Sequence, residues 1–375
     1  MTASATPLTP SPPTDDYLEP LDPFVEREKR AVGGGGHPIL SVRDLSVQFP
    51  TDDGVVQAVD TVSFDVFENE VLGIVGESGS GKTVTSMAVL GLLPKRARVT
   101  GEVQYRDRSI LGLPDKELRA VRGNHIAMIF QDALASLNPV YTVGSQIAEA
   151  IRIHNRELSK DDLRSRVVEL LDVVGIPNPA RRVDEYPHEY SGGMRQRAMI
   201  AMSIANEPDV LIADEPTTAL DVTIQAQVLE VLERVQARTS SAIVLITHDL
   251  GVVAGVADRV MVMYAGRAVE MGSVDDIFYE PQHPYTLGLL ASLPRLDQDT
   301  RDARLHRIKG QPPSLLAVPS GCAFHPRCDF AHLPDPCSTV RPELRAIEGF
   351  GHTAACHLAE EIAKMRPRDL KTETQ

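Results

Sequence analysis

The chain has 375 residues, of which 42% are hydrophobic and 24% are charged, a balance typical of a globular protein with one large or two ordinary domains. The formal net charge is −14, Trp is absent and aromatic residues make up 5%, so no nucleic-acid partner is expected. No stretch reaches the roughly 18 uninterrupted apolar residues of a transmembrane helix. The first residues lack the basic and apolar segments of a secretory signal, so we expect an intracellular protein.

The chain divides into three parts by composition. Residues 1–37 are rich in Pro, Thr, Ser, Asp and Glu and lack apolar periodicity, which predicts a disordered N-terminal tail. Residues 38–300 alternate strand-like and helix-like stretches, as an α/β domain does. Residues 301–375 are Pro-rich, weakly periodic and hold all four cysteines, so we expect a Cys-containing C-terminal extension with a regulatory or assembly role.

Two kinds of pattern within the α/β part predict a sheet flanked by helices. Continuous apolar runs are typical of parallel strands buried on both faces, and such runs occur at 69–76, 209–214 and 241–248. Helical periodicity dominates about residues 132–208, including a helix predicted at 161–175. Residues 260–272 predict a hairpin that turns at Ala265-Gly266.

The segment GESGSGKT, residues 76–83, fits the pattern G-x-x-x-x-G-K-[ST] and lies between an apolar strand and a helical stretch. Its glycines let backbone N–H groups converge on phosphate oxygens, and the helix N-terminus adds positive partial charge. Lys82 is expected to reach the β- and γ-phosphates, and the Thr83 hydroxyl to enter the shell of Mg²⁺. The nucleotide-binding residues expected here are Gly76, Glu77, Ser78, Gly79, Ser80, Gly81, Lys82, Thr83 and Val84.

Two carboxylates end the second apolar run, in the segment LIADEP at 211–216. A parallel strand would deliver Asp214 to the carboxyl edge of the sheet, where such sheets bind ligands, and Asp214 would hold Mg²⁺ through water. Glu215 follows it and is expected to polarise a water molecule against the γ-phosphate. On its own, the pair would be explained equally well as an acidic strand end that faces solvent.

The segment YSGGMRQR at 190–197 resembles the signature of the ATP-binding-cassette ATPases, which usually reads L-S-G-G-Q. The first and last letters differ from the commonest form. A Ser that caps a helix, followed by two Gly amides, can approach an anion closely. The resemblance implies that this cap contacts the ATP held by the opposite subunit. The intact core of the signature is Ser191, Gly192 and Gly193.

Other positions of this family are matched in order along the chain. The resemblance implies that Gln131 links Mg²⁺ and the attacking water to the helical subdomain, and that His248 contacts the γ-phosphate. Asp221 would contact the partner subunit. Phe49 stands where the family stacks an aromatic ring on adenine, although its strand alternation also fits a core residue. Val84 departs from the hydroxyl residue that many cassettes carry, and its backbone amide could serve instead.

A closer resemblance, over about residues 39–360, is to the ATPase subunits of bacterial oligopeptide/dipeptide permeases and of related nickel importers. Its most discriminating segments are HPYT at 283–286 and GCAFHPRC at 321–328. It implies a P-loop fold with a parallel-sheet core, an antiparallel β subdomain and a helical subdomain. It also implies an ATPase that powers peptide import from the cytoplasmic face of the membrane. The implied partners are a second, commonly non-identical cassette subunit, two transmembrane permease subunits and an extracytoplasmic peptide-binding protein.

The sequence leaves other functions open. Nickel or another small solute could take the place of peptide. DNA-repair and translation cassette ATPases usually carry two cassettes, coiled coils or basic insertions, which this acidic chain lacks. A P-loop kinase or GTPase would lack the signature, and a metal-sensing module with a degenerate ATPase would not retain Glu215.

The cysteines of the chain gather near its C-terminus, at Cys322, Cys328, Cys337 and Cys356. Disulfides are disfavoured inside cells, and structural zinc sites usually use C-x₂₋₄-C pairs, whereas the gaps here are longer. Four inert buried thiols remain possible. The resemblance favours a [4Fe–4S] cluster held by the four thiolates, structural or redox-sensing in role, with zinc as the alternative.

Overall fold

The computed structural model describes residues 36–132, 136–218, 221–293, 307–347 and 352–365. The disordered tail predicted for residues 1–37 lies outside this part of the chain, except for Gly36 and His37. Among the residues described, no helix has both the length and the apolar composition that a membrane crossing requires.

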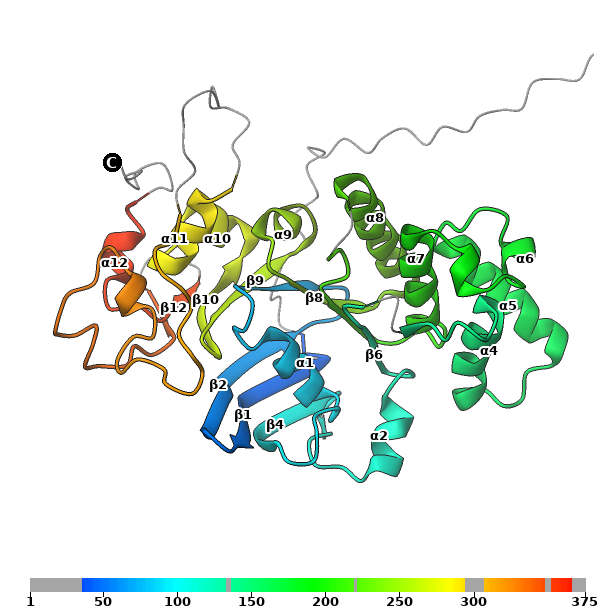
Figure 1. Ribbon diagram of the computed structural model, residues 1–375, viewed down its shortest axis with the longest axis horizontal. Helices are drawn as coiled ribbons and strands as arrows, with labels where there is room; N and C mark the ends of the chain where they lie inside the picture. Colours follow the sequence, from blue (N-terminus) through cyan, green and yellow to red (C-terminus); the bar gives the residue numbers. More distant parts are fainter. Residues whose placement is uncertain (1–35, 133–135, 219–220, 294–306, 348–351, 366–375) are drawn as a thin grey trace, which may run out of the picture. The chain divides into compact units, whose positions relative to one another are not determined.

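The central element is an eight-stranded sheet with the strand order β11-β12-β10-β9-β3-β8-β7-β6 (Figure 1). Its strands are β3 Val71–Val75, β6 Ile126–Ile129, β7 Val210–Asp214, β8 Ala242–Thr247, β9 Arg259–Tyr264, β10 Arg267–Ser273, β11 Arg345–Ala346 and β12 Thr353–Ala354. From β9 to β6 the neighbouring strands pair in parallel, which confirms the parallel strands predicted from the apolar runs. Parallel strands end at one common edge, so the residues that follow them gather there.

A second sheet has four strands in the order β2-β1-β4-β5 and is antiparallel. Its strands are β1 Leu40–Thr51, β2 Gly54–Val66, β4 Arg98–Tyr105 and β5 Arg108–Ser109. Buried side chains of β1 and β2 share one hydrophobic cluster with the helix α1 Lys82–Val89. The antiparallel sheet therefore packs on the side of the main sheet that carries α1.

The helices between β6 and β7 occupy the stretch that the sequence predicts to be helical, about 132–208 (Figure 1). The helix predicted at 161–175 is confirmed as α5, whose N-cap Ser159 accepts a hydrogen bond from Asp162 N. Besides α1, the described helices are α2 Asp115–Val121, α4 Val143–His154, α5 Lys160–Val173, α6 Pro179–Arg182, α7 Gly192–Ser203, α8 Val222–Thr239, α9 Leu250–Val256, α10 Val274–Tyr279, α11 Pro284–Ala291 and α12 Ala359–Ile362, with the 3-10 turns η1 Pro187–Glu189 and η2 His325–Arg327.

Two hydrophobic cores cover the opposite faces of the main sheet. In β7, Leu211 and Ala213 belong to the core that contains α4, α5, α7 and α8. Val210 and Ile212 belong to the other core, with the antiparallel sheet and α1. Because both faces are buried, the strand has no polar alternation, which is why the sequence shows continuous apolar runs.

The predicted hairpin is confirmed by β9 and β10, which pair in antiparallel fashion around residues 265 and 266. Ala265 and Gly266 both have positive φ, at 48° and 82°. Two successive residues of this kind form the type I′ turn that matches the twist of a two-residue hairpin.

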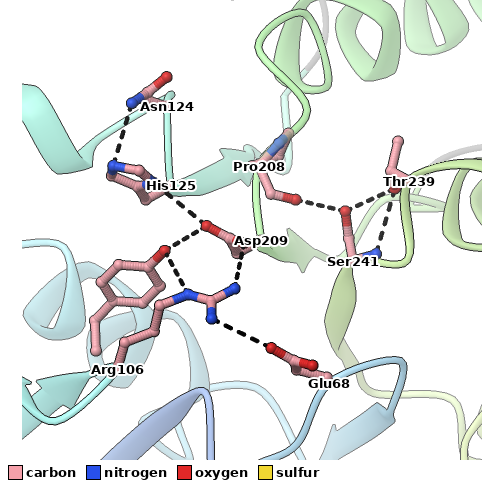
Figure 2. Close-up of polar contacts among 9 residues, drawn as sticks. Glu68, Arg106, Asn124, His125, Pro208, Asp209, Thr239 and Ser241 are labelled. Carbon is pink, nitrogen blue, oxygen red and sulfur yellow. Dashed lines mark hydrogen bonds and ion pairs between the residues drawn. The ribbon is translucent and has the colours of Figure 1, made fainter.

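A polar network fixes the amino-terminal edge of β6 and β7, opposite the edge where the parallel strands end (Figure 2). Asp209 precedes β7 and accepts hydrogen bonds from the Tyr105 hydroxyl and, over 2.8 Å, from Arg106. Arg106 also lies 3.3 Å from Glu68, and His125 lies 3.3 Å from Asp209. Burial alone would raise the pKa of Asp209, but hydrogen bonds from Tyr105 and Arg106 hold it below its usual value. The network ties the two sheets together at this edge.

The C-terminal residues pack onto the main sheet. Strand β12 pairs with β10, where Ala354 lies opposite Glu270. The Glu270 carboxylate lies 3.1 Å from His352 Nε2, and both side chains are fully buried. A Cβ at Gly272 would lie 2.4 Å from the Cβ of His352, so a larger residue would push the extension off β10. Some apolar residues of the extension, such as Phe324, are buried against the α/β part, whereas others, such as Leu333 and Val340, are exposed.

Candidate active site

The phosphate loop predicted at residues 76–83 connects β3 to α1. Gly81 has a φ of +100°, and a Cβ there would lie 2.5 Å from the Ala58 carbonyl oxygen, so the loop requires glycine at this position. Helix α1 has no side-chain cap on its first N–H groups. The buried Ser80 hydroxyl has no hydrogen-bond partner among the described residues. Uncapped N–H groups and an unpartnered hydroxyl fit the oxygens of a phosphate group.

The Lys82 ammonium is enclosed by this loop. Its side chain is 4% exposed, and Nζ donates to the carbonyl oxygens of Gly76 over 2.7 Å and Glu77 over 3.1 Å. Burial lowers the pKa of Lys82, and the carboxylates of Glu215 and Asp214 oppose that shift by favouring the ammonium. A buried cation that can exchange carbonyl partners for phosphate oxygens suits a triphosphate.

A hydroxyl and a carboxylate meet at the start of α1. Thr83 Oγ1 donates to Asp214 Oδ1 over 3.1 Å, and Asp214 is the buried last residue of β7. Burial raises the pKa of Asp214, and the Glu215 carboxylate adds to the effect, whereas the Thr83 hydroxyl and Lys82 lower it. Two hard oxygen ligands with excess negative charge nearby are the kind of site that Mg²⁺ prefers.

Glu215 joins the other predicted catalytic residues. It has a left-handed φ of 46°, which is strained for a residue with a side chain. Its Oε2 accepts hydrogen bonds from Gln131 Nε2 over 2.9 Å and from Thr218 Oγ1 over 2.8 Å, and it lies 3.4 Å from His248 Nδ1. Its Oε1 lies 3.9 Å from Lys82 Nζ. The structure thus brings the predicted catalytic residues Glu215, Gln131 and His248 together with Lys82.

Strand order explains this convergence. The phosphate loop follows β3, and Gln131, Glu215 and His248 follow β6, β7 and β8. These four strands are consecutive in the main sheet and run parallel, so their carboxyl ends lie at the same edge. Ligands of open α/β sheets bind at that edge.

The signature segment lies at the start of α7. The Ser191 hydroxyl caps the helix by accepting a hydrogen bond from Met194 N over 3.3 Å. Tyr190 is 2% exposed and its hydroxyl donates to the Arg182 carbonyl over 3.0 Å, so an aromatic ring fills the core where the commonest signature has Leu. Gly192 is exposed. In the described part of the chain, no hydrogen bond or ion pair joins the signature to the phosphate loop.

Comparisons with known proteins decide the family. A model of the ABC transporter family matches residues 59–218, and a model of the oligopeptide/dipeptide transporter C-terminal region matches residues 269–334. The dipeptide transport ATP-binding protein DppD of Bacillus subtilis is 52% identical over 328 residues, which cover 87% of this chain and 96% of that protein. The chain belongs to the ATP-binding-cassette (ABC) transporter family. Its ATPase activity follows from that membership.

Further similarities agree with this placement among the ABC proteins. The oligopeptide transport ATP-binding protein OppD of Salmonella typhimurium is 48% identical over 320 residues, covering 85% of this chain and 93% of that protein. The ATP-binding cassette MJ0796, solved as a dimer with ADP and Pi, has a TM-score of 0.56 and 25% identity. That cassette matches over 98% of its length and covers 63% of this chain. The predicted α/β cassette fold is therefore confirmed.

Three more cassette positions have defined surroundings. Phe49 lies half-buried in β1, and both Phe49 and Val84 pack on the core shared by the antiparallel sheet and α1. Asp221 caps α8 by accepting a hydrogen bond from Ile224 N over 3.0 Å, directly after residues 219–220, which lie outside the described part. A role for Phe49 at adenine and for Asp221 at the partner stays a prediction.

Sequence reasoning missed three residues that contact the site. Thr218 donates to the Glu215 carboxylate, as described above. The Tyr285 hydroxyl accepts a hydrogen bond from Glu77 N over 2.8 Å, and Arg327 binds the Glu77 carboxylate. Tyr285 lies in the segment HPYT and Arg327 in GCAFHPRC. These two segments carry the family resemblance, but their sequence alone does not predict a contact with the phosphate loop.

All four cysteines line one small pocket. Their thiols are not joined by disulfides. Burial raises the pKa of Cys322, and it raises those of Cys328 and Cys356 to about 12. Within the described ranges, no group of three or more His, Cys, Asp or Glu side chains is placed to hold a metal ion. The gathering of the thiols is observed, whereas a metal centre has no support from this ligand geometry.

Proposed function

We propose that this chain is the ATP-hydrolysing subunit of a membrane transporter that imports oligopeptides or dipeptides. The observation that carries the proposal is the meeting of Lys82, Asp214, Glu215 and Gln131 at one edge of the sheet. The names of the relatives DppD and OppD support peptide as the solute, as does the match over residues 269–334.

Nucleotide binding is assigned to the phosphate loop and its neighbours. The loop N–H groups and Lys82 bind the phosphates, and Phe49 stacks on the adenine. Mg²⁺, when bound, supplies positive charge that offsets the charge of the phosphates. Thr83 and Asp214 would hold it, because their oxygen atoms meet beside the loop, and Gln131, whose amide nitrogen binds Glu215, would add its amide oxygen.

Hydrolysis is assigned to Glu215 as general base. Its carboxylate takes the proton of the attacking water. Gln131 and Thr218 hold the carboxylate in place through hydrogen bonds, and His248 stands beside it to contact the γ-phosphate. Three neighbours on one carboxylate reduce the rotamers it can adopt, which favours a fixed distance to the water.

Each chain supplies half of two sites. Its phosphate loop binds one ATP, and its signature completes the site of a second cassette paired with it head to tail. This is supported by the lack of any polar contact between signature and loop in the described residues, and by the dimeric form of MJ0796. Closure follows ATP binding, and hydrolysis resets the pair. The second cassette is expected to be a similar but non-identical chain. The half-site residues are Ser191, Gly192, Gly193 and Asp221.

Two transmembrane permease subunits contact the helical subdomain, about residues 132–208. This stretch carries a cavity of about 440 Å³ lined by Tyr141 and by residues of α4. Val140, Tyr141 and Ile153 are large apolar residues that are 69%, 57% and 61% exposed. The cavity lining combines the apolar Tyr141 and Ile153 with charged residues such as Arg156, so it suits an amphipathic element of a membrane subunit. The chain would thus sit on the cytoplasmic face of the membrane, and an extracytoplasmic peptide-binding protein would deliver the solute.

Uptake by intact cells tests this function. In cells that lack only this chain, adding it back should restore uptake of labelled dipeptides or short oligopeptides. The variant Glu102→Gln, which changes an exposed carboxylate of β4 outside the helical subdomain, should restore it as well. If the chain restores uptake of nickel instead of peptide, nickel would be the transported solute. No effect on any uptake would place the ATPase outside transport.

The division of the chain into a cassette over 38–300 and an extension over 301–375 is part of the same proposal. The extension would carry a [4Fe–4S] cluster on Cys322, Cys328, Cys337 and Cys356, with zinc as the alternative. The proposal rests on the family resemblance and on the gathering of the four thiols around one pocket, although the described side chains do not form a metal-ligating group. When bound, the cluster would add covalent links to a segment with few apolar residues.

Metal analysis tests the cluster directly. Protein purified without oxygen is expected to be brown and to contain about four irons per chain, as a Cys₄ cluster requires. The variant Cys337→Ser should lose both colour and iron. Colourless protein with one zinc would establish the alternative, and protein without metal would leave four buried thiols.

A further inference from the structure

Arg327 of the C-terminal extension reaches the phosphate loop. Its guanidinium donates to both carboxylate oxygens of Glu77, over 2.6 and 2.9 Å, in the two-pronged geometry of a strong ion pair. The Arg327 side chain is 5% exposed and that of Glu77 is 28% exposed. The two residues are 250 positions apart, so only the folded extension can make this contact.

The guanidinium is held from several sides. Arg327 Nε donates to the Lys309 carbonyl over 2.8 Å, and a second nitrogen donates to the Tyr264 hydroxyl over 3.4 Å. The ring centroids of Tyr264 and Phe324 lie 5.8 and 5.9 Å from its central carbon. Burial works against the charged form, but the hydrogen bonds to Glu77 and Tyr264 outweigh it and raise the pKa of Arg327. The cation is therefore fixed in place.

The HPYT segment fixes the backbone of the same loop residue. The Tyr285 hydroxyl accepts the hydrogen bond of Glu77 N, and Tyr285 is fully buried in α11. His283 caps that helix, since its Nδ1 accepts a hydrogen bond from Tyr285 N over 3.1 Å. The rings of Tyr285 and Phe324 lie 5.4 Å apart. The segments HPYT and GCAFHPRC therefore both contact Glu77, through Tyr285 and Arg327.

A carboxylate is costly in a loop that binds a triphosphate, because it carries the same charge as the phosphates. Moreover, the carbonyl of Glu77 is one of the two acceptors of Lys82. A shift of Glu77 therefore displaces a partner of the cation that must reach the phosphates. Pairing with Arg327 removes both problems, since it neutralises the carboxylate and restrains the residue.

We propose that Arg327 is a positioning residue for ATP binding, which neutralises Glu77 and fixes the phosphate loop, so that ATP affinity depends on the seated extension. This inference rests on the proposed ATPase function. Arg327 belongs to η2, the turn between Cys322 and Cys328 that is closed by hydrogen bonds such as Arg327 N to Phe324 O over 2.9 Å. The turn that carries two cysteines of the thiol pocket thereby also carries the contact to the loop.

Steady-state kinetics of the full-length chain in the assembled transporter test the inference. Arg327→Gln is expected to raise the KM for ATP about tenfold, with kcat changed by less than about threefold. The double variant Arg327→Gln/Glu77→Gln should recover most of the lost affinity, because no unpaired carboxylate remains. Arg341→Gln is the matched control. It breaks another ion pair between extension and cassette, to Asp60, and should leave KM unchanged.

The outcomes distinguish a role of Arg327 in positioning the phosphate loop from a role in packing alone. An unchanged KM in Arg327→Gln would overturn the inference, and so would a double variant as weak as the single one. If Arg327→Gln does not fold, Arg327→Met gives the same decision, since it keeps an apolar stem beside the Tyr264 and Phe324 rings but removes the cation. An unaltered KM in that variant is equally negative. Failure of the proposed function looks different, because the unsubstituted protein would then hydrolyse ATP without restoring peptide uptake.

Discussion

Replacing Glu215 with Gln is expected to lower the ATP turnover of the assembled transporter by about 10²–10⁴-fold while ATP binding persists. The amide keeps the shape of the side chain but is no base. Lys82 loses the electrostatic support of Glu215 in this variant but keeps that of Asp214 and its hydrogen bonds to the loop carbonyls, so its contact with phosphate should persist. The variant should therefore accumulate the ATP-bound, closed pair of cassettes.

Three measurements check this expectation: turnover, equilibrium ATP affinity and the amount of paired cassettes in the presence of ATP. Glu102→Gln makes the same chemical change on an exposed residue of β4 outside the site and should match the unsubstituted protein in all three. Near-normal turnover by Glu215→Gln would remove Glu215 from the role of base. Lost ATP binding would instead show that its charge supports the loop.

The carboxyl edge of the main sheet was predictable because its determinants are local. Continuous apolar runs identify β3, β7 and β8, and the residues that follow each run are necessarily placed at the strand ends. The position of Asp214 therefore followed from sequence alone. The order of the strands did not, and that order is what brings both Gln131 and His248 to the Glu215 carboxylate.

The contacts of the extension could not be predicted from local pattern. Its segments have weak periodicity, and its partners lie far away in the chain, as with Arg327 and Glu77, which are 250 positions apart. The motifs identify HPYT and GCAFHPRC as characteristic segments, but they do not predict that both contact Glu77. The positions of the cysteines in the sequence likewise show that they are clustered along the chain. That all four line one pocket is visible only in the three-dimensional structure.

Gly192→Asp is expected to abolish turnover in the assembled transporter, by at least about 100-fold, without weakening ATP binding by the isolated chain. Gly192 is exposed at the first position of α7, and a Cβ there would have no atom within 4 Å. The chain can therefore accept the larger residue without strain. The added carboxylate would stand at a helix N-terminus proposed to face the phosphates of the other cassette, where it repels them.

Gly255→Asp serves as the matched control, because Gly255 is also exposed and also has open space around its Cβ. Gly193 would be a poor choice, since a Cβ there lies 3.0 Å from Ile224 and would disturb α8.

The isolated chain should turn over ATP poorly, with a rate that rises on adding its partner cassette and membrane subunits. Full activity from a demonstrably monomeric chain, or an active Gly192→Asp transporter, would contradict pairing. An exposed glycine with open space around it affects turnover only if another subunit contacts it.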